Sequence, residues 1–180
     1  IEAGGGTPPA HLRGKSLFPV FAGKQSHKEF VYGIMTTRGI NNGSPHYGIR
    51  SIRSETHKLI WNLTPEIKFV NACTTAPEFK SWLALAATGN ADALAKTSRY
   101  QLRPEFELYD IEEDPLEMTN LAEKPELAEI QKDLNQRLRN WMKSCGDRGK
   151  VTEMEALEHM TGNRKKRKKT SKSLKTPEKK

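Results

Sequence analysis

Three stretches in the first part of the chain have the composition and alternation of extended strands. Residues 30–37 are rich in β-branched and aromatic side chains, which favours a strand. Residues 47–52 and 57–63 predict two antiparallel strands joined by a turn at residues 54–56. In the second of these, Leu59, Trp61 and Leu63 are large apolar residues at every second position, as in a strand with one buried face.

Farther along, the apolar positions recur at helical spacing. Residues 77–88 and 92–100 predict two helices, the first with Pro and Glu at its start. Residues 107–110 predict a short strand. Residues 126–143 predict the clearest helix, with one apolar face at a period of 3.6 residues. Its members are Leu127, Ile130, Leu134, Leu138 and Trp141. The pattern indicates an α+β fold, a small antiparallel sheet with packed helices.

The net charge of +8 is concentrated at one end of the chain. Residues 164–180 hold ten Lys or Arg and one Glu, whereas the other 163 residues hold 20 basic and 21 acidic side chains. Such a basic tail is too polar to form a core, and we expect it to be disordered. A nearly neutral folded part argues against nucleic acid as its partner. Binding of a polyanion or nucleic acid by the tail is the alternative function.

Several other classes of protein are disfavoured by the sequence. No apolar run approaches the length of about 18 residues that a membrane span requires. The chain does not begin with Met and shows no signal peptide, so we expect it to start inside a longer protein. The five histidines do not fall at metal-ligand spacing, and the acidic residues 110–114 lack the Gly and Glu of a calcium loop. We therefore predict no metal site in this chain.

One polar cluster brackets the Gly- and Asn-rich loop between the first two strands, a position where binding residues are common. Its members are Thr36, Thr37, Arg38, His46 and Arg50. The planar guanidinium of arginine suits the oxygens of sulfate or carboxylate. The alternative is that Arg38 and Arg50 form ordinary structural ion pairs. No self-sufficient catalytic motif accompanies the cluster, since the sequence has no G-x-S-x-G, P-loop or H-E-x-x-H.

Several segments, taken in order, resemble the C-terminal region of sulfatases of the alkaline phosphatase superfamily. The similarity is closest to the N-sulfoglucosamine sulfohydrolase (heparan N-sulfatase) group and its bacterial relatives. The segments are residues 14–20 with Gly-x-Ser-hydrophobic-x-Pro, residues 30–40, residues 47–63 with Tyr-Gly-Ile-Arg and Asn-Leu, residues 107–122 with Glu-Leu-Tyr-Asp, Asp-Pro and Asn-Leu-Ala, and the helix that ends at Trp141.

The resemblance implies a fold and a domain organisation. The sheet and helices would form the C-terminal subdomain of an alkaline-phosphatase-like α/β sulfatase. Residues 1–40 would be the end of the large sulfatase domain, residues 41–160 the C-terminal subdomain, and residues 161–180 the disordered basic tail. The N-terminal sulfatase domain and a sulfated glycan substrate are then the expected partners. The expected location is the periplasm, the outside of the cell or the lysosome.

The resemblance also implies where the chemistry takes place. In that family a formylglycine, made from the Cys or Ser of a C/S-x-P-x-R motif, acts beside a bound calcium ion. This sequence has no such motif, so we expect no catalytic residue and no bound cofactor in this chain, which would be inactive alone. Its expected contribution is to bind substrate, through Arg50 first and then His46 and Arg38. Relatives often carry Pro where this chain has Gly48, and we expect the more flexible glycine to alter the loop.

Overall fold

A computed structural model describes residues 1–12, 14–23, 27–37, 40, 42–44, 46–156 and 158. Its elements in chain order are η1 (Glu2–Gly4), α1 (Phe18–Phe21), β1 (Val31–Met35), β2 (Ile49–Arg53), β3 (His57–Asn62), α2 (Ala72–Thr75), α3 (Pro77–Ala87), α4 (Ala91–Gln101), β4 (Phe106–Asp110), η3 (Pro125–Leu127), α5 (Ala128–Cys145) and α6 (Lys150–Glu155). The predicted strands and the three longest helices are all present, whereas α1, α2 and α6 were not predicted. None of the helices within the described residues is long and apolar enough to cross a membrane.

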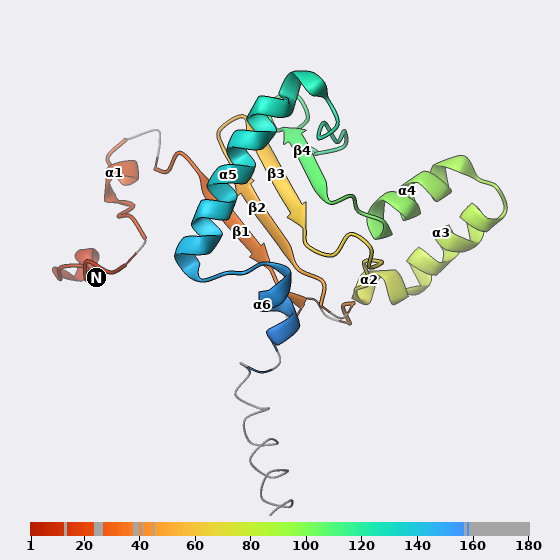
Figure 1. The fold of residues 1–180 in the computed structure, drawn as a ribbon, viewed down its shortest axis with the longest axis horizontal. Coiled ribbons are helices and arrows are strands. Elements are labelled where there is room, and N and C mark those ends of the chain that lie inside the picture. The colour runs from red at the N-terminus through yellow and green to blue at the C-terminus, as the bar shows by residue number, and fades with distance from the viewer. Residues whose placement is uncertain are drawn as a thin grey trace, which may run out of the picture.

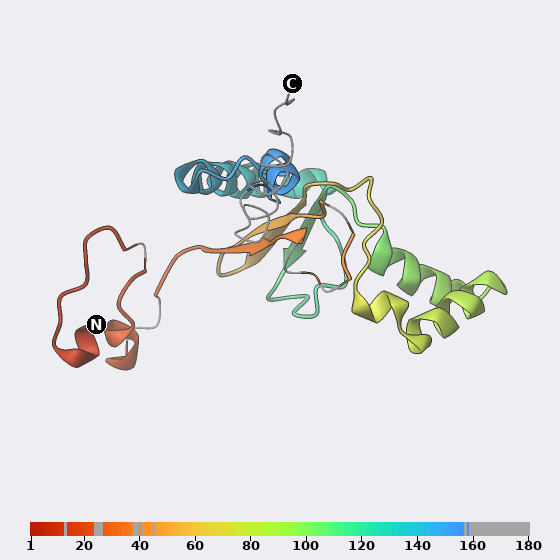
Figure 2. The same cartoon turned by 90° about the horizontal axis from the view of Figure 1, so that it is seen from below.

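The four strands form one antiparallel sheet in the order β1-β2-β3-β4. Ile52 of β2 lies opposite Leu59 of β3, which in turn lies opposite Leu108 of β4. All three side chains pack against α5, the helix that covers one face of the sheet in Figures 1 and 2. β1 pairs with β2 along its whole length. The sheet therefore includes residues that precede residue 41, the expected start of the C-terminal subdomain. The predicted tail, residues 161–180, lies outside the described residues.

The main core lies between the sheet and α5. Ile52, Leu59 and Leu108 are fully buried and pack against Leu134, Leu138 and Met142 of the helix. These three helical residues follow one another at intervals of four, which keeps them on one face.

The helical period gave most but not all of the core-facing residues of α5, since Leu134 and Leu138 are buried and Leu127 and Trp141 pack against the same core. Ile130 fits that period but is 37% exposed, and Figure 1 shows that the first turns of α5 extend past the end of the sheet. Met142, which was not in the predicted set, is buried at the other end of the helix. The buried stripe is therefore shifted toward the C-terminus of α5.

Two parts of the chain project from this body (Figures 1 and 2). Helices α3 and α4 form a hairpin whose base is joined to the body by an aromatic contact between Phe69 and Tyr100. Trp82, Leu85 and Leu94 of the hairpin are each about half-exposed. The described part of residues 1–23 lies on the opposite side of the sheet from the hairpin and is also largely exposed. These projecting segments leave apolar surface uncovered within the described chain.

Candidate functional site

Arg50 lies in β2, where its side chain points toward the C-terminal end of α5. The residue is 1% exposed. Its Nε atom donates to Asp147 Oδ2 at 2.5 Å, and Nη2 donates to Glu153 Oε1 at 2.8 Å. Its Nη1 atom donates to the backbone carbonyls of Met35 and Ile49. The predicted alternative of a structural ion pair thus describes the contacts that Arg50 makes, while its substrate-binding role stays a prediction.

The turn after α5 places Asp147 beside Arg50. Gly146 ends the helix in the left-handed region, with φ of 74°, which glycine adopts without steric cost. The carboxylate of Asp147 then accepts a hydrogen bond from the Gly149 N–H at 2.8 Å in addition to those from Arg50. Burial acts to raise the pKa of Asp147, but these hydrogen bonds outweigh burial and the pKa is lowered. Asp147 is therefore an ionised partner of Arg50.

Glu153 brings α6 into the same cluster and is itself 1% exposed. Its Oε2 atom accepts a hydrogen bond from the Thr37 N–H at 3.1 Å. Its backbone carbonyl lies 3.3 Å from His46 Nδ1. A Cβ atom built on Gly48 would lie 2.5 Å from Glu153 Cγ. The glycine in this loop is therefore required by the close approach of Glu153, a role that differs from the flexibility expected from sequence.

The predicted polar cluster is thus partly assembled around one unpredicted residue. Thr37, His46 and Arg50 all contact Glu153, whereas Arg38 lies outside the described residues. Sequence reasoning missed Asp147 and Glu153. A Gly-Asp pair directly after a strong helical period was the one signal for Asp147, because a helix that ends at glycine turns sharply there.

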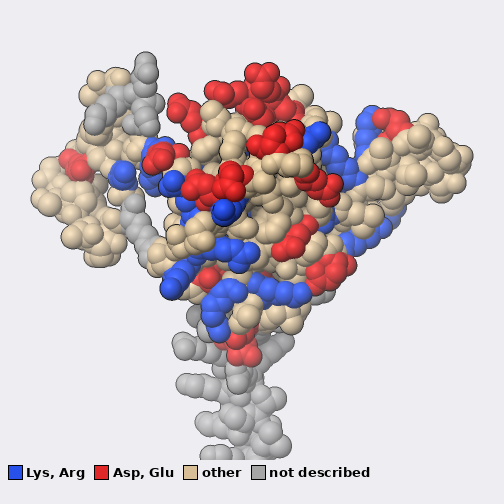
Figure 3. Space-filling model, turned by 45° about the horizontal axis from the view of Figure 1, so that its top comes forward, with Lys and Arg blue, Asp and Glu red and all other residues tan. Residues whose placement is uncertain are grey.

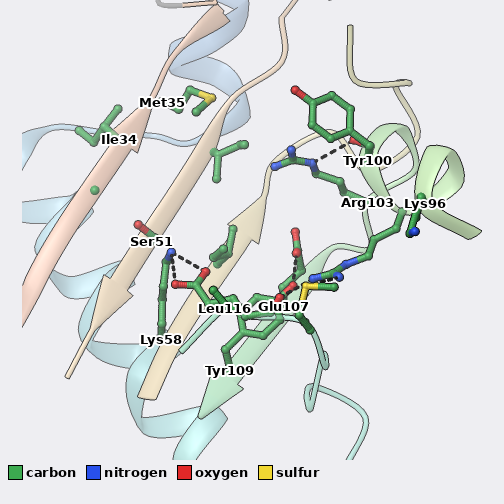
Figure 4. A pocket seen from close by; sticks show the side chains of 16 residues that line it. Ile34, Met35, Ser51, Lys58, Lys96, Tyr100, Arg103, Glu107, Tyr109 and Leu116 are labelled. Atoms are coloured by element: carbon green, nitrogen blue, oxygen red, sulfur yellow. Dashed lines mark hydrogen bonds and ion pairs between the residues drawn. The ribbon is translucent and has the colours of Figure 1, made fainter. Parts of the chain in front are cut away.

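The sheet face opposite α5 carries a second polar site, shown in Figure 4. It is an open groove of about 650 Å³ between the sheet, α4 and the loop after β4. Lys58 donates to Glu117 at 2.7 Å on one side of the groove. On its floor, the Tyr109 hydroxyl donates to Glu107 at 2.6 Å. Burial and this hydrogen bond raise the pKa of Tyr109 to about 12.

The groove has both apolar and cationic walls. The large apolar side chains that line it and are exposed are Ile34, Met35, Leu116 and Met118. Arg103 extends from the segment after α4, with its guanidinium 4.4 Å from the centroid of the Phe69 ring, and Figure 4 shows this side chain above the end of β3. The groove can accept a surface that combines apolar and acidic groups.

The Glu-Leu-Tyr-Asp segment and the residues after it stabilise this region of the fold. Asp110 Oδ1 accepts hydrogen bonds from the backbone N–H groups of Glu112 and Glu113. Asn120 Oδ1 accepts a hydrogen bond from the Leu108 N–H at 2.9 Å, which extends the pairing of β4. Asp114 Oδ2 accepts one from the Thr119 N–H. The motif therefore fixes a turn and a strand edge, which explains why it identifies a fold.

Within the described ranges, no group of three or more His, Cys, Asp or Glu side chains is arranged to hold a metal ion.

Solved sulfatase structures share this arrangement of a four-stranded antiparallel sheet and packed helices. One solved structure, of a protein in complex with its substrate D-glucosamine-2-N,6-O-disulfate, matches with a TM-score of 0.53 and 21% identity. The match covers 83% of this chain and 23% of that chain. The predicted α+β fold, a small antiparallel sheet with packed helices, is confirmed, and its structural neighbours are sulfatases.

Sequence comparison finds relatives with a higher identity to the chain. It is 30% identical over 148 residues to an ulvan-active sulfatase of Formosa agariphila, covering 82% of this chain and 28% of that protein. It is 28% identical over 148 residues to the human N-sulphoglucosamine sulphohydrolase, covering 76% of this chain and 27% of that protein. No family model matches the chain.

These comparisons confirm the resemblance to the C-terminal region of a sulfatase. Sulfatase homologues cover most of this chain, and the chain spans about a quarter of the length of the curated relatives it matches.

Proposed function

We propose that the chain is the C-terminal part of a sulfatase that hydrolyses sulfate ester or sulfamate groups of a sulfated glycan. The observation that carries the proposal is the similarity to two curated sulfatases over about four fifths of the chain. Their names specify ulvan and N-sulphoglucosamine. A structural neighbour was solved with a disulfated glucosamine as its substrate. A sulfated sugar is the chemistry that these proteins share.

In this proposal the hydrolytic centre lies upstream. A formylglycine beside calcium would supply the attack on sulfur in the N-terminal domain. This sequence lacks the C/S-x-P-x-R motif from which formylglycine is made, and its described residues form no metal cluster. The chain alone would then be inactive, and the parent protein would act in the periplasm, outside the cell or in the lysosome.

The contribution of this chain would be to shape the substrate side of the pocket. His46 is half-buried and lies in the loop between β1 and β2, which Arg50 ties to the C-terminal segment. Because the guanidinium of Arg50 already contacts two buried carboxylates, we propose that Arg50 holds this loop in place. His46 would contact the sugar directly. Arg38, in the same loop, is proposed to bind a carboxylate or a neighbouring sulfate.

The large sulfatase domain is the proposed partner of the open sheet face. A sheet needs cover on its apolar face, and within the described residues α5 covers one face while Met35, Leu116 and Met118 remain exposed on the other side. This supports docking of the N-terminal domain onto the groove of Figure 4.

The alternative, a polyanion-binding module, depends on the basic tail. Figure 3 shows acidic and basic side chains interspersed on the visible face of the described part. A surface of mixed sign does not favour binding of nucleic acid. In this alternative the polyanion would therefore be bound by residues 164–180.

The direct experiment is to express the longer protein that contains this chain and measure inorganic sulfate released from ulvan and from heparan sulfate. We expect release from one of them, and we expect His46→Ala to raise KM by about tenfold, since removal of a substrate hydrogen bond costs of order 1.4 kcal/mol. His57→Ala is the matched control, because His57 lies at the far end of β3 beside Thr56. Absence of sulfate release from every sulfated glycan would overturn the proposal.

A further inference from the structure

Glu153 makes contacts that its position in a short C-terminal helix does not require. Its carboxylate joins Arg50 of β2 to the Thr37 N–H, and its own carbonyl faces His46. The side chain is 1% exposed, although α6 has only six residues. One residue from the C-terminal segment therefore contacts both ends of the loop between β1 and β2.

The contact with His46 has a chemical consequence for the imidazole. A carbonyl oxygen can only accept a hydrogen bond, so Nδ1 of His46 must carry the proton in the neutral ring. Nε2 is then the atom with a lone pair available to another group. The tautomer of His46 is set by the backbone of Glu153.

The backbone of His46 is itself held in an uncommon conformation. Its φ is 55°, in the left-handed region that residues other than glycine rarely adopt. Its carbonyl accepts a hydrogen bond from Thr64 Oγ1 at 3.3 Å, and the next residue, Tyr47, is 1% exposed. Such outliers persist where the surroundings over-determine them, and they are concentrated at binding sites.

Gly48 completes the arrangement by leaving space. The three atoms nearest to a Cβ built on Gly48 are Cγ, Cδ and Oε1 of Glu153, at 2.5, 2.7 and 2.9 Å. All three lie beyond the Cβ atom of Glu153. The closest conflicts of an alanine at position 48 are therefore with the carboxylate-bearing part of this side chain. The side chain of Glu153 occupies the space that the absence of a Cβ atom at Gly48 leaves free.

We propose that Glu153 is a positioning residue for His46, holding the imidazole in the Nδ1–H tautomer so that Nε2 can accept a hydrogen bond from a hydroxyl group of the substrate. Helix α6 thereby holds the loop between β1 and β2 in place through Glu153, Gly48 and Arg50. This inference rests on the proposed function, since it assigns His46 to substrate binding.

The first test is a double-mutant cycle on size. Gly48→Ala is expected to destabilise the protein when Glu153 is present and to have a much smaller effect in the Glu153→Ala background. Thermal unfolding of the four proteins measures this coupling. Equal effects of Gly48→Ala in the two backgrounds would overturn the proposed fit.

The second test follows the imidazole itself. With ¹⁵N-labelled histidine, the His46 signals, assigned through a His46→Gln variant, are expected to report the Nδ1–H tautomer. Alanine keeps the backbone carbonyl but removes the side-chain contacts with Arg50 and Thr37 that hold this carbonyl against His46. In Glu153→Ala the signals are therefore expected to shift toward the mixture of tautomers of a free histidine. Glu155→Ala is the matched control, because Glu155 lies on the same helix and pairs with Arg148 at the surface. An unchanged His46 signal in Glu153→Ala would contradict the inference.

The third test separates a positioning role from a structural one. In the longer protein we expect Glu153→Ala to raise KM by about tenfold, the lower end of the range for loss of a group that orients a ligand residue. We expect kcat to change little, Glu153→Gln to restore part of the loss, and Glu155→Ala to have no effect. A parallel fall in kcat across all variants would indicate a structural role and overturn the inference.

Failure of this inference and failure of the proposed function would give different results. If the wild-type protein releases no sulfate, the proposed function fails. The cycle and the imidazole signal would still decide whether Glu153 positions His46.

Discussion

At the scale of single residues, the ionic contacts of Arg50 dominate the site. A buried guanidinium that faces two carboxylates is stable only while the partners remain charged and hydrogen-bonded. Both carboxylates are hydrogen-bonded to Arg50, and the side chains of Asp147 and Glu153 are 7% and 1% exposed. The cluster joins β2 to the segment after α5, so its loss would weaken the attachment of α6 to the sheet.

Asp147→Asn removes one charge from this cluster. We expect it to lower the free energy of unfolding at pH 7 by about 3 kcal/mol, because the buried Arg50 loses an ionised partner. Since the pKa of Asp147 is lowered in the folded state, its contribution is present above the usual pKa of about 3.9 and is lost as the pH falls below it. The difference between wild type and variant should therefore narrow below about pH 4.

Chemical denaturation as a function of pH measures this effect. Asp133→Asn is the control, because Asp133 forms an exposed i,i+4 pair with Arg137, and such pairs contribute about 0.5 kcal/mol or less. Equal effects of the two substitutions at pH 7 would show that the Arg50 cluster does not stabilise the fold.

Tyr109 gives a second prediction at this scale, at alkaline pH. Its pKa is raised to about 12, above the usual value of about 10. Its contribution to stability should be complete below about pH 10 and be lost as the pH rises toward about 12. An ultraviolet titration of tyrosinate should show a late step that Tyr109→Phe removes. Titration of all four tyrosines near their ordinary pKa would contradict the hydrogen bond to Glu107.

At the scale of elements, α5 organises the molecule. It supplies the helical side of the main core through Leu134, Leu138 and Met142. Its C-terminal glycine then turns the chain toward Arg50. The same helix therefore covers the sheet and positions the following residues, which contact Arg50 and hold the loop between β1 and β2.

Two substitutions in α5 test where its buried stripe lies. Leu138 is fully buried, and Leu138→Ala should lower the free energy of unfolding by about 2–5 kcal/mol, as expected for a cavity in a packed core. Ile130, which the sequence also placed on this face, is 37% exposed, and Ile130→Ala should cost less than about 1 kcal/mol. Urea unfolding measures both, and comparable losses would place Ile130 in the core.

The elements also show what could be inferred from the sequence and what could not. The strands and long helices were predicted because their periods are set by local geometry, and the order of motifs identified the sulfatase fold. Glu153 was missed because it meets Arg50 across 103 positions of the chain, a contact that no local pattern contains. Gly48 was assigned flexibility for the same reason, since the neighbour that needs its space lies far away in sequence.

At the scale of the whole molecule, uncovered apolar surface is the main feature. The groove carries Leu116 and Met118, which are 80% and 59% exposed, and the projecting α3–α4 hairpin carries Trp82 and Leu94. Within the described residues α5 covers only one face of the sheet. This matches a chain that spans about a quarter of the length of its relatives.

The chain expressed alone should therefore be poorly soluble or form oligomers, because exposed apolar patches associate. Replacing Leu116 and Met118 together by Ser should reduce association without loss of the α5 core. Size-exclusion chromatography with light scattering measures this. A wild-type chain that is a monodisperse, cooperatively melting monomer would contradict the proposed docking face.

The sequence of the gene upstream of Ile1 is the most direct test that this chain is the C-terminal part of a sulfatase. Assignment to a sulfatase predicts a Cys or Ser in a C/S-x-P-x-R motif, with an early Asp-Asp pair, in the same reading frame. A stop codon or an unrelated domain at that place would contradict it and would favour polyanion binding by the basic tail.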